Sequence, residues 1–327
     1  MRCTTFTILL IAASLSACQK ESAPPKPPNT TAAPGSAAAQ KFDFLIDWQA
    51  EPTYLGIYYA KALGAFSELG LDVNIVQSWG ANDAASAIAA GKYKIGTASG
   101  AATVIANSSG ADLVSMAVIY HRLPTAVFGL RESGISKPKD LEGRNVGIYA
   151  KSITKNEFEA FAKLNQVAID KVNVVAISGP DLPYLLTKKV DAVLNYFELS
   201  PTQLAMEKNT FQLLLDEHGV KSYGLNVITS RKELQKDPKL ITGITKAVLR
   251  GYQEGCSNQE KAIGVFHGMF PEKDVKYVRT SWAKVCAFIA GDFGSQSVEG
   301  WQTTLDLYKG LGLLNGYVDA KNILPPQ

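Results

Sequence analysis

From Lys41 onward, short apolar runs alternate with stretches in which apolar residues recur at helical spacing. Short runs rich in β-branched and aromatic side chains predict strands, and the longer periodic stretches predict helices. In the first part of the chain the predicted strands are Phe42–Ile46, Val73–Ser78, Lys94–Ala98 and Leu113–Tyr120, and the predicted helices are Pro52–Gly70, Asn82–Gly91 and Gly100–Ser109.

A second series of the same kind begins near Gly134 and runs into a mainly helical C-terminal part. Its predicted strands are Asn145–Tyr149, Val172–Ile177, Asp191–Phe197 and Gly224–Ser230, its predicted helices are Ser152–Asn165 and Asp181–Lys188, and residues from Arg231 onward are mostly helical. Strands that alternate with helices predict an α/β fold with largely parallel sheets.

Two segments of the chain share one plan. "AIAAGKYKIGTAS" and "YLLTKKVDAVLNYF" each read as a helix, a basic turn and a strand. The similarity indicates either an internal repeat or chance. A repeat would bring two segments to the carboxyl ends of two sheets, where open α/β sheets bind ligands. Two such sheets facing each other would form a two-lobed body with a cleft.

The N-terminus reads as an export signal. "MRCTTFTILLIAASLSAC" has one arginine, an apolar run from Phe6 to Ile11, and then small residues up to Cys18. That apolar run is far shorter than the ~20 residues that a membrane-spanning helix needs. "Leu-Ser-Ala-Cys" resembles the bacterial lipobox, which predicts a signal peptide over residues 1–17 and lipid on Cys18. The alternative is an ordinary signal cleaved near Ala17, which would leave a free cysteine.

Residues 18–40 read as a tether that follows the lipidated cysteine. The stretch "QKESAPPKPPNTTAAPGSAAAQ" is rich in proline and alanine and holds no large apolar residue. It cannot bury a core, so a disordered, partly extended linker is expected. Together with the signal, it predicts an exported protein held to a bacterial membrane by lipid alone, on the periplasmic side in a Gram-negative cell.

Composition and charge limit the class of protein and the kinds of partner to be expected for the remaining 287 or so residues. The chain of 327 residues is 46% hydrophobic and 19% charged, which is typical of globular proteins and suggests about two domains. The formal charge of +3 comes without a basic tract, which argues against a nucleic-acid partner. Cys256 and Cys286 are the cysteines of the folded part, and in an oxidising compartment they form either a disulfide or two buried thiols.

Four motifs in order resemble a known family. They are "DW…EP…GIYYAKALGAFSELGLDVNI", "AIAAGKYKIGTAS", "PKDLEGRNVGI" and "GPDLPYLLTKKVDAVLNYFE", and the match runs from about Phe42 to about Tyr252. The chain resembles the solute-binding proteins of ABC transporters, in the branch that groups thiamine-pyrimidine, sulfonate and nitrate binders. The resemblance implies a periplasmic-binding-protein fold of type II, with a ligand cleft between two α/β lobes and delivery of the ligand to a membrane permease.

The resemblance also implies the division of the chain. Residues 41–126 and 228–327 would form the first lobe and residues 127–227 the second, with hinge crossings near Pro124–Phe128 and Tyr223–Val227. Ligand contacts from both lobes would favour the closed state. A monomer that binds a small molecule without cofactor or metal is expected.

Each candidate ligand-binding residue lies at the end of a predicted strand, in the turn after it, in the first turn of the next predicted helix, or beside a crossing. The candidates are Trp48, Glu51, Tyr54, Trp79, Asn82, Ser99, Gly100, Tyr120, Tyr149, Ser152, Tyr196, Glu198 and Tyr223. Trp48 would stack on a planar heterocycle, or else cover the core of its own lobe. The backbone amides before Asn82 and the Asn82 side chain would grip a polar ligand atom. The small residues Ser99 and Gly100, at a helix N-terminus, would let a ligand approach closely. Alternatively, Asp83 caps a helix, and the small residues serve close packing.

Glu51 and Tyr54 bear on the identity of the ligand. Pyrimidine-binding members of the resembled family typically carry Asn near the first position and His three residues later. An ionised carboxylate at Glu51 accepts hydrogen bonds and repels anions, so it favours an amino-bearing or cationic ligand. This departure from the family pattern counts against nitrate and sulfonate and bears on the thiamine-pyrimidine assignment, while the expected class stays a planar heterocycle (a pyrimidine, a thiamine precursor or a similar compound). The alternative role for Glu51 is to cap the next helix. The alternative ligand is a small anion, either an alkyl sulfonate or nitrate.

Enzyme readings find little support in the sequence. His121, His218 and His267 lack metal-ligand spacing with one another or with cysteine, and no nucleophile or phosphate-loop motif is present. The fungal thiamine-pyrimidine synthase that shares the expected fold carries a cysteine-rich iron-binding motif, which this sequence lacks. We therefore expect a binding protein, with an enzyme or an adhesin on the same fold as lesser alternatives.

Overall fold

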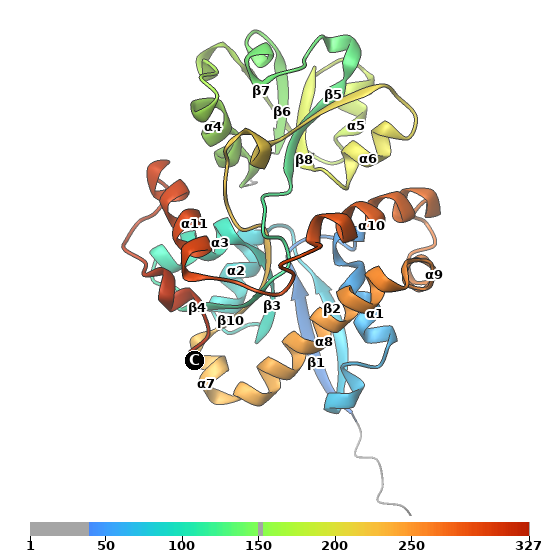
Figure 1. Ribbon diagram of the computed structural model, residues 1–327, viewed down its shortest axis with the longest axis vertical. Coiled ribbons are helices and arrows are strands. Elements are labelled where there is room, and N and C mark those ends of the chain that lie inside the picture. The colour runs from blue at the N-terminus through green and yellow to red at the C-terminus, as the bar shows by residue number, and fades with distance from the viewer. Residues whose placement is uncertain (1–38, 150–152, 327) are drawn as a thin grey trace, which may run out of the picture. The chain divides into compact units, whose positions relative to one another are not determined.

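The computed structural model describes residues 39–149 and 153–326, and their strands form two five-stranded sheets (Figure 1). The first sheet has the order β2-β1-β3-β10-β4 and the second β7-β6-β8-β5-β9. In each sheet four strands share one direction, while β10 in the first and β5 in the second run antiparallel to both neighbours. The predicted α/β fold with two largely parallel sheets is therefore confirmed.

The first sheet and its early helices come mostly from the N-terminal part of the described chain. They are β1 (Gln40–Ile46), α1 (Leu55–Ala62), β2 (Leu71–Gln77), α2 (Ala81–Ala89), β3 (Ile95–Ser99), α3 (Gly100–Ser108), β4 (Leu113–Val118) and β10 (Leu225–Ser230). The second sheet and its helices are β5 (Thr125–Leu130), β6 (Asn145–Tyr149), α4 (Thr154–Leu164), β7 (Asn173–Ile177), α5 (Leu182–Leu186), β8 (Ala192–Tyr196), α6 (Ser200–Ala205) and β9 (Thr210–Leu214).

Strand β1 shows why the first sheet is covered by helices on both faces. Successive side chains of a strand point to opposite faces. Phe44 and Ile46 accordingly pack in a core cluster with residues of α1, whereas Leu45 packs on the other face with Ala84 and Ala85 of α2. The last three residues of β1, Phe44, Leu45 and Ile46, form an apolar run without polar alternation, as a strand segment buried on both faces requires.

The two sheets repeat one topology. Without β10 and β5, the order is β2-β1-β3-β4 in the first sheet and β7-β6-β8-β9 in the second, which is the same sequence of connections. The two similar segments noted in the sequence form α2–β3 and α5–β8, and both strands take the third place in their sheets. This equivalence supports the internal repeat rather than chance.

Three elements differ from the sequence-based prediction. Strands β5 and β9 were not predicted, although "TAVFGL" and "TFQLL" carry the β-branched and aromatic residues typical of strands. The single helix predicted over Pro52–Gly70 is instead one 3-10 turn, the short helix α1, and a second 3-10 turn. The chain leaves α1 at Leu63 because Gly64 adopts a left-handed φ of +76°.

The chain passes between the sheets twice, from β4 to β5 and from β9 to β10. Strand β5 starts at Thr125 and β10 at Leu225, so the proposed lobe boundaries at residues 126/127 and 227/228 fall inside these strands. Pro124 has no N–H to donate to a ladder, which suits its place just before β5. We use "first lobe" and "second lobe" for each sheet with its helices.

The two crossings lie against each other. The Gly224 N–H donates to the Tyr120 carbonyl at 2.8 Å, and the Gly100 N–H donates to the Gly224 carbonyl at 2.7 Å. A Cβ atom on Gly224 would lie only 2.8 Å from the Arg122 carbonyl oxygen and 2.9 Å from Pro124 Cδ. Glycine at this position therefore allows the second crossing to approach the first.

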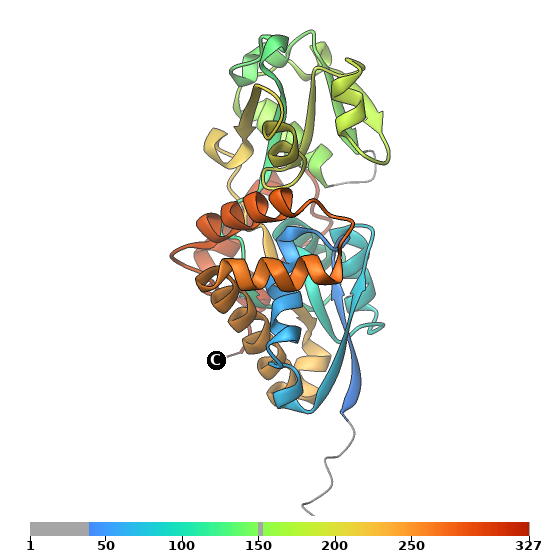
Figure 2. The same ribbon diagram turned by 90° about the vertical axis from the view of Figure 1, so that its right-hand side faces the viewer.

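The C-terminal helices belong to the first lobe. They are α7 (Arg231–Lys236), α8 (Pro238–Ser257), α9 (Gln259–Met269), α10 (Val275–Ile289) and α11 (Val298–Gly310). Figure 2 shows α8 and α9 beside α1, and residues of these helices share one core cluster with β1. Helix α11 packs on α3. Among the described residues, no helix combines the length and the apolar character needed to span a bilayer.

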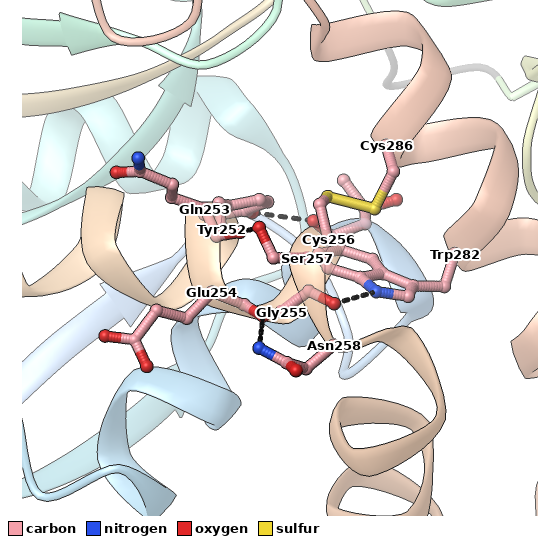
Figure 3. The surroundings of a disulfide bond; sticks show 10 residues. Tyr252, Gln253, Glu254, Gly255, Cys256, Ser257, Asn258, Trp282 and Cys286 are labelled. Carbon is pink, nitrogen blue, oxygen red and sulfur yellow. Dashed lines mark hydrogen bonds between the residues drawn. A yellow bond between two sulfur atoms is a disulfide. The ribbon is translucent and has the colours of Figure 1, made fainter.

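A disulfide joins α8 to α10. Cys256 and Cys286 are bonded, with their Cα atoms 5.4 Å apart, so the structure has the first of the two alternatives left open by the sequence (Figure 3). Beside this bond, Trp282 of α10 donates from Nε1 to the Gly255 carbonyl at 3.1 Å. Helix α10 is thus tied to α8 by a covalent bond and by a buried ring. The predicted lipidation site Cys18, the signal and nearly all of the tether lie outside the described residues.

The close approach at Gly224 leads to a first prediction. Gly224→Ala should lower the free energy of unfolding by about 1–3 kcal/mol, because the new methyl group overpacks the crossings. Gly264→Ala, on α9 with open space around its Cβ position, is the matched control and should be neutral or stabilising by up to about 1 kcal/mol. Urea unfolding measures both, and equal values for the two variants would contradict the packing argument.

The disulfide leads to a second prediction. Its partners are separated by 30 residues, and on the loop-entropy model such a closure stabilises by about 3–4 kcal/mol. The double variant Cys256→Ala/Cys286→Ala should lose about that much free energy of unfolding, measured in urea. A reducing agent should destabilise the wild-type protein similarly and leave the double variant unchanged. A reductant effect of equal size on both proteins would show that the bond is not its target.

Candidate functional site

The carboxyl ends of β1 and β8 meet at the junction of the two lobes. Asp47 follows β1 in the first lobe, and Tyr196 ends β8 in the second. Burial is the main cause that raises the pKa of Tyr196 well above its usual range, and the charges of Asp47, Glu157 and Glu198 raise it further. The ring of Tyr196 therefore lies among carboxylates from both lobes. This junction is the candidate site.

Asp47 is a buried carboxylate that the sequence analysis did not single out. Its Oδ1 accepts hydrogen bonds from the Thr97 hydroxyl at 2.5 Å and from the Tyr54 hydroxyl at 2.9 Å. Its backbone N–H donates to Thr97 Oγ1 at 3.0 Å. Burial raises the pKa of Asp47, while these hydrogen bonds oppose the rise. The signal in the sequence was an acid directly after a strand end, in the same "DW" pair as Trp48.

The Tyr54 ring lies in the core of the first lobe and does not line a pocket. It is 2% exposed, packs in the core cluster of the first lobe and uses its hydroxyl on Asp47. Its neighbours on α1 and β1 take up its ring, so its contact with a ligand is not supported. Its role in the structure is to orient the Asp47 carboxylate.

Glu51 has a third role that neither alternative foresaw. It stands at the N-cap position of the 3-10 turn Pro52–Tyr54, as the capping alternative expects, but its side chain makes no capping hydrogen bond. Its carboxylate instead pairs with Lys273 at 2.9 Å and accepts from the Tyr277 hydroxyl at 3.2 Å. The lysine balances the charge of Glu51, and this weakens the argument that Glu51 selects a cation.

Two tryptophans are exposed at the strand ends of the first lobe. Trp48 follows β1 and is 38% exposed, and Trp79 follows β2 and is 77% exposed. Trp48 is therefore not covered by the core of its own lobe. Asn82 is exposed in the first turn of α2. The N-cap of that helix is Gly80, so Asp83 is not the capping residue. These rings and the amide remain available to a ligand.

Ser99 and Gly100 make hydrogen bonds within the first lobe and to the second crossing. Ser99 caps α3 by accepting from the Ala102 N–H at 3.1 Å. The Gly100 amide donates to the second crossing, and a Cβ on Gly100 would lie 2.3 Å from the Tyr223 carbonyl oxygen. The close approach at this position is made by the protein's own backbone, as the packing alternative expects, so a ligand contact at Ser99 and Gly100 is not supported.

Tyr223 makes its contacts within the fold. Its hydroxyl accepts from the Ser297 N–H at 3.2 Å, and its ring meets Trp301 edge-on at 5.1 Å. His121 contacts the same ring and lies 2.9 Å from the Ser295 carbonyl oxygen through Nε2. Both residues pack the crossings against the α11 region, so the ligand contact predicted for Tyr223 is not supported.

Tyr120 and Glu198 join the lobes. The Tyr120 and Thr53 hydroxyls, both from the first lobe, donate to Glu198 Oε1 at 2.9 Å each. The Ser281 hydroxyl of α10 donates to the Glu198 carbonyl oxygen at 2.5 Å. Burial raises the pKa of Glu198 to about 7, and its hydrogen bonds oppose the rise. Glu198 Oε2 is buried without a hydrogen-bond partner among the described residues.

The second lobe adds tyrosines and a further acid. Tyr149, at the end of β6, is half-buried, and its pKa is raised mainly by burial and then by the charge of Asp181. Asp181 is 3% exposed and accepts from Asn195 Nδ2 at 2.7 Å. The sequence pattern predicts Asp181 only as the start of a helix. Ser152 lies outside the described residues.

Glu157 is a second buried carboxylate near the crossings. It accepts from the Thr125 hydroxyl at 2.6 Å, and the Tyr308 hydroxyl of α11 lies 3.5 Å away. Burial raises its pKa to about 7. The sequence held a signal for this burial, because Glu157 lies four residues before the buried Phe161 and so shares the apolar face of α4.

Taken together, the junction is rich in acids and rings. The charges of three carboxylates, Asp47, Glu157 and Glu198, raise the pKa of Tyr196, and Tyr308 adds to them. Lys284 is the cation that acts on Glu198. Carboxylates accept hydrogen bonds, and aromatic rings stack on planar groups. The arrangement suits a planar ligand that donates hydrogen bonds. In the described part of the chain, no three metal-binding side chains group together.

Glu157 leads to a third prediction. Its folded-state pKa of about 7 exceeds the ordinary value, so the folded state binds the extra proton and loses stability as pH rises from about 4.5 through 7. Glu157→Gln removes this dependence and should be more stable than wild type by about 1–3 kcal/mol at pH 8 and not at pH 5. Urea unfolding at the two pH values measures it. Glu159→Gln, on the exposed side of α4, should show no such difference between pH values.

Comparisons with known proteins agree with this architecture. Residues 51–262 match the family model described as "NMT1/THI5 like". The chain is 21% identical over 309 residues to the formylaminopyrimidine-binding protein of Halalkalibacterium halodurans, a match that covers 91% of each chain. It superposes on the aliphatic sulphonate binding protein SsuA from Escherichia coli with a TM-score of 0.71 and 15% identity, over 88% of this chain and 92% of that one.

A relative with an enzyme name matches over a shorter span. The chain is 27% identical over 156 residues to 4-amino-5-hydroxymethyl-2-methylpyrimidine phosphate synthase THI11 of Saccharomyces cerevisiae. The match covers 47% of this chain and 46% of the synthase, so it spans about half the length of that relative. The family model covers well over half of this chain and includes Glu51, Tyr196 and Glu198. The protein belongs to the NMT1/THI5-like family.

Proposed function

We propose that this protein is the solute-binding component of an ABC importer, and that it captures a small planar heterocycle between its lobes. The family membership and the two-lobed fold support a binding protein. One relative that matches over 91% of its own length is named for binding formylaminopyrimidine. A pyrimidine or thiamine precursor, with ring nitrogens and an amino group, is the ligand class we favour.

The observation that carries the proposal is the acidic, aromatic junction around Tyr196. The charges of Asp47 in the first lobe and Glu198 in the second both raise the pKa of Tyr196, and Trp48 is exposed next to Asp47 in the sequence. An aminopyrimidine offers N–H donors to carboxylates and a flat face to rings. Trp79, Asn82 and Tyr149 are further candidate contacts.

A small anion is the second candidate, because the structural neighbour SsuA is named for binding aliphatic sulphonate. The local charges oppose it. A sulfonate or nitrate beside Asp47 and Glu198 would meet repulsion unless these groups were protonated. Lys284 lies close enough to Glu198 to influence its pKa, but its own pKa is lowered by burial.

Catalysis is not part of the proposal. The yeast relative is named a synthase, but the match covers less than half of either chain. The cysteines of this chain beyond Cys18 are Cys256 and Cys286, and these two are joined by the disulfide. They are not free to act as thiolate ligands or nucleophiles.

Export and anchoring complete the proposal. The N-terminal sequence supports a signal over residues 1–17, a lipidated Cys18 and a tether up to residue 40. The tether would hold a monomeric binding protein near its permease. The crossings around Pro124 and Gly224 are the proposed hinge, about which ligand contacts from both lobes favour closure.

The ligand class can be tested directly. Isothermal titration of the purified protein with formylaminopyrimidine, 4-amino-5-hydroxymethyl-2-methylpyrimidine, riboflavin and an alkyl sulfonate should give heat with at least one heterocycle and none with the sulfonate. Native mass spectrometry should show the mass of a co-purified heterocycle. Binding of the sulfonate alone would overturn the heterocycle proposal, and turnover of a bound pyrimidine would overturn the exclusion of catalysis.

Trp48 gives a fourth prediction. If its ring stacks on the ligand, Trp48→Ala should weaken binding by about 1.5–3 kcal/mol, or roughly 10- to 150-fold. Tyr317→Ala is the control, because Tyr317 is 89% exposed in the C-terminal segment and makes no contact proposed for the ligand. Unchanged affinity in the Trp48 variant would remove this ring from the site.

A further inference from the structure

We infer that Glu198 is a proton-controlled latch between the lobes: its protonated form favours the lobe contact, and its ionised form favours separation. This inference goes beyond the proposed function, because it concerns the protein without ligand. It rests on which lobe supplies the surroundings of this one side chain.

The surroundings of Glu198 come from the first lobe, although Glu198 itself follows β8 of the second. Thr53 and Tyr120 donate to its carboxylate, and Ser281 donates to its carbonyl oxygen. The preceding ring, Phe197, packs on Phe288 of α10 with centroids 4.6 Å apart. Glu198 is 0% exposed as a result. Separation of the lobes would remove these partners together and return the carboxyl group to water.

The ionised form is poorly supported in this contact. Both hydroxyl donors serve Oε1, and Oε2 is buried without a partner among the described residues. A buried carboxylate with an unpaired oxygen carries a desolvation cost. The protonated form has a better arrangement, because the Thr53 and Tyr120 hydroxyls can rotate and accept a hydrogen bond as well as donate one.

The groups facing Glu198 set the balance of charge. Tyr120 lies in the first crossing, just after β4. Tyr252 lies on α8, and Tyr277 and Lys284 lie on α10. Tyr196, on its own strand, is the remaining titratable neighbour. The tyrosines have raised pKa values and stay neutral in the physiological range. Lys284 favours the ionised form of Glu198, but burial has the larger effect on Glu198.

The sign of the pH effect follows from linkage. Burial raises the pKa of Glu198 to about 7 in the contact, whereas a carboxyl group exposed by separation has a pKa of about 4.3. Joining the lobes therefore takes up a proton between these values. The contact is favoured below about pH 5 and weakens as pH rises through 7. From pH 5.5 to pH 8 the ratio of joined to separated lobes should fall by about tenfold or more.

Glu157 is not part of this latch. Its closest donor, Thr125, belongs to its own lobe at 2.6 Å, whereas Tyr308 of the first lobe is 3.5 Å away. Separation of the lobes leaves that donor in place. The pH response of the lobe contact should therefore depend on Glu198.

Small-angle scattering of the ligand-free protein from pH 5.5 to 8.5 tests the latch. The radius of gyration should rise with pH in the wild-type protein and stay near its low-pH value in Glu198→Gln, which mimics the protonated form. Glu207→Gln, an exposed glutamate of the same lobe, is the matched control and should follow the wild type. A pH-independent wild-type radius, or a Glu198→Gln variant that follows the wild type, would overturn the inference.

Thr53→Val provides an independent check if Glu198→Gln does not fold, as judged by circular dichroism. This variant removes one hydrogen-bond donor to the ionised Glu198 carboxylate, so the lobe contact with ionised Glu198 becomes less stable. The pH midpoint of the rise in radius of gyration should therefore move to lower pH. An unmoved midpoint would overturn the latch. Because no ligand is present, neither result depends on the ligand proposal, which the titration panel tests separately.

Discussion

The hydrogen bonds between the two crossings are the constraint on which the rest of the structure depends. Gly224 donates to Tyr120 and accepts from Gly100, so both crossings and the start of α3 form one backbone assembly. This assembly places the end of β4 beside the start of β10. It thereby sets where each sheet presents its carboxyl edge. Side chains at these edges can meet only because the two chain segments between the lobes run so close together.

This arrangement carries a desolvation cost, because it buries several carboxylates. Asp47, Glu157 and Glu198 are each less than 5% exposed, and each is held by hydroxyl groups rather than by a cation. Burial raises all three pKa values. A fold that needed only stability would gain from apolar residues at such places. Acids retained at a lobe junction fit a protein that recognises donors on a ligand and changes shape around it.

The stretch "DWQAEPTY", which begins the first of the four family motifs, shows what residue patterns can predict about the site and what they cannot. Its position after a strand predicted a place at the sheet edge, and Trp48 is exposed there. The roles within the motif were less predictable. Glu51 pairs with Lys273, which lies 222 residues away, and Tyr54 turns inward to Asp47. No local pattern contains such a partner, because side-chain pairing across that distance depends on how α10 packs on the first lobe. The same holds for Gly100, whose apparent ligand contact is the second crossing.

The sequence by itself determined the α/β class, most strands, the repeat of α2–β3 in α5–β8, and the family motifs. These features depend on residue periodicity and short-range turns, which are local. It also held the predicted signal and lipidated cysteine. Tertiary structure alone decided the disulfide, the antiparallel placement of β5 and β10, and the burial of Asp47, Glu157 and Glu198. The reason is physical: desolvation of a carboxylate and the close approach of two backbones depend on segments far apart in the chain, which only the folded lobes bring together.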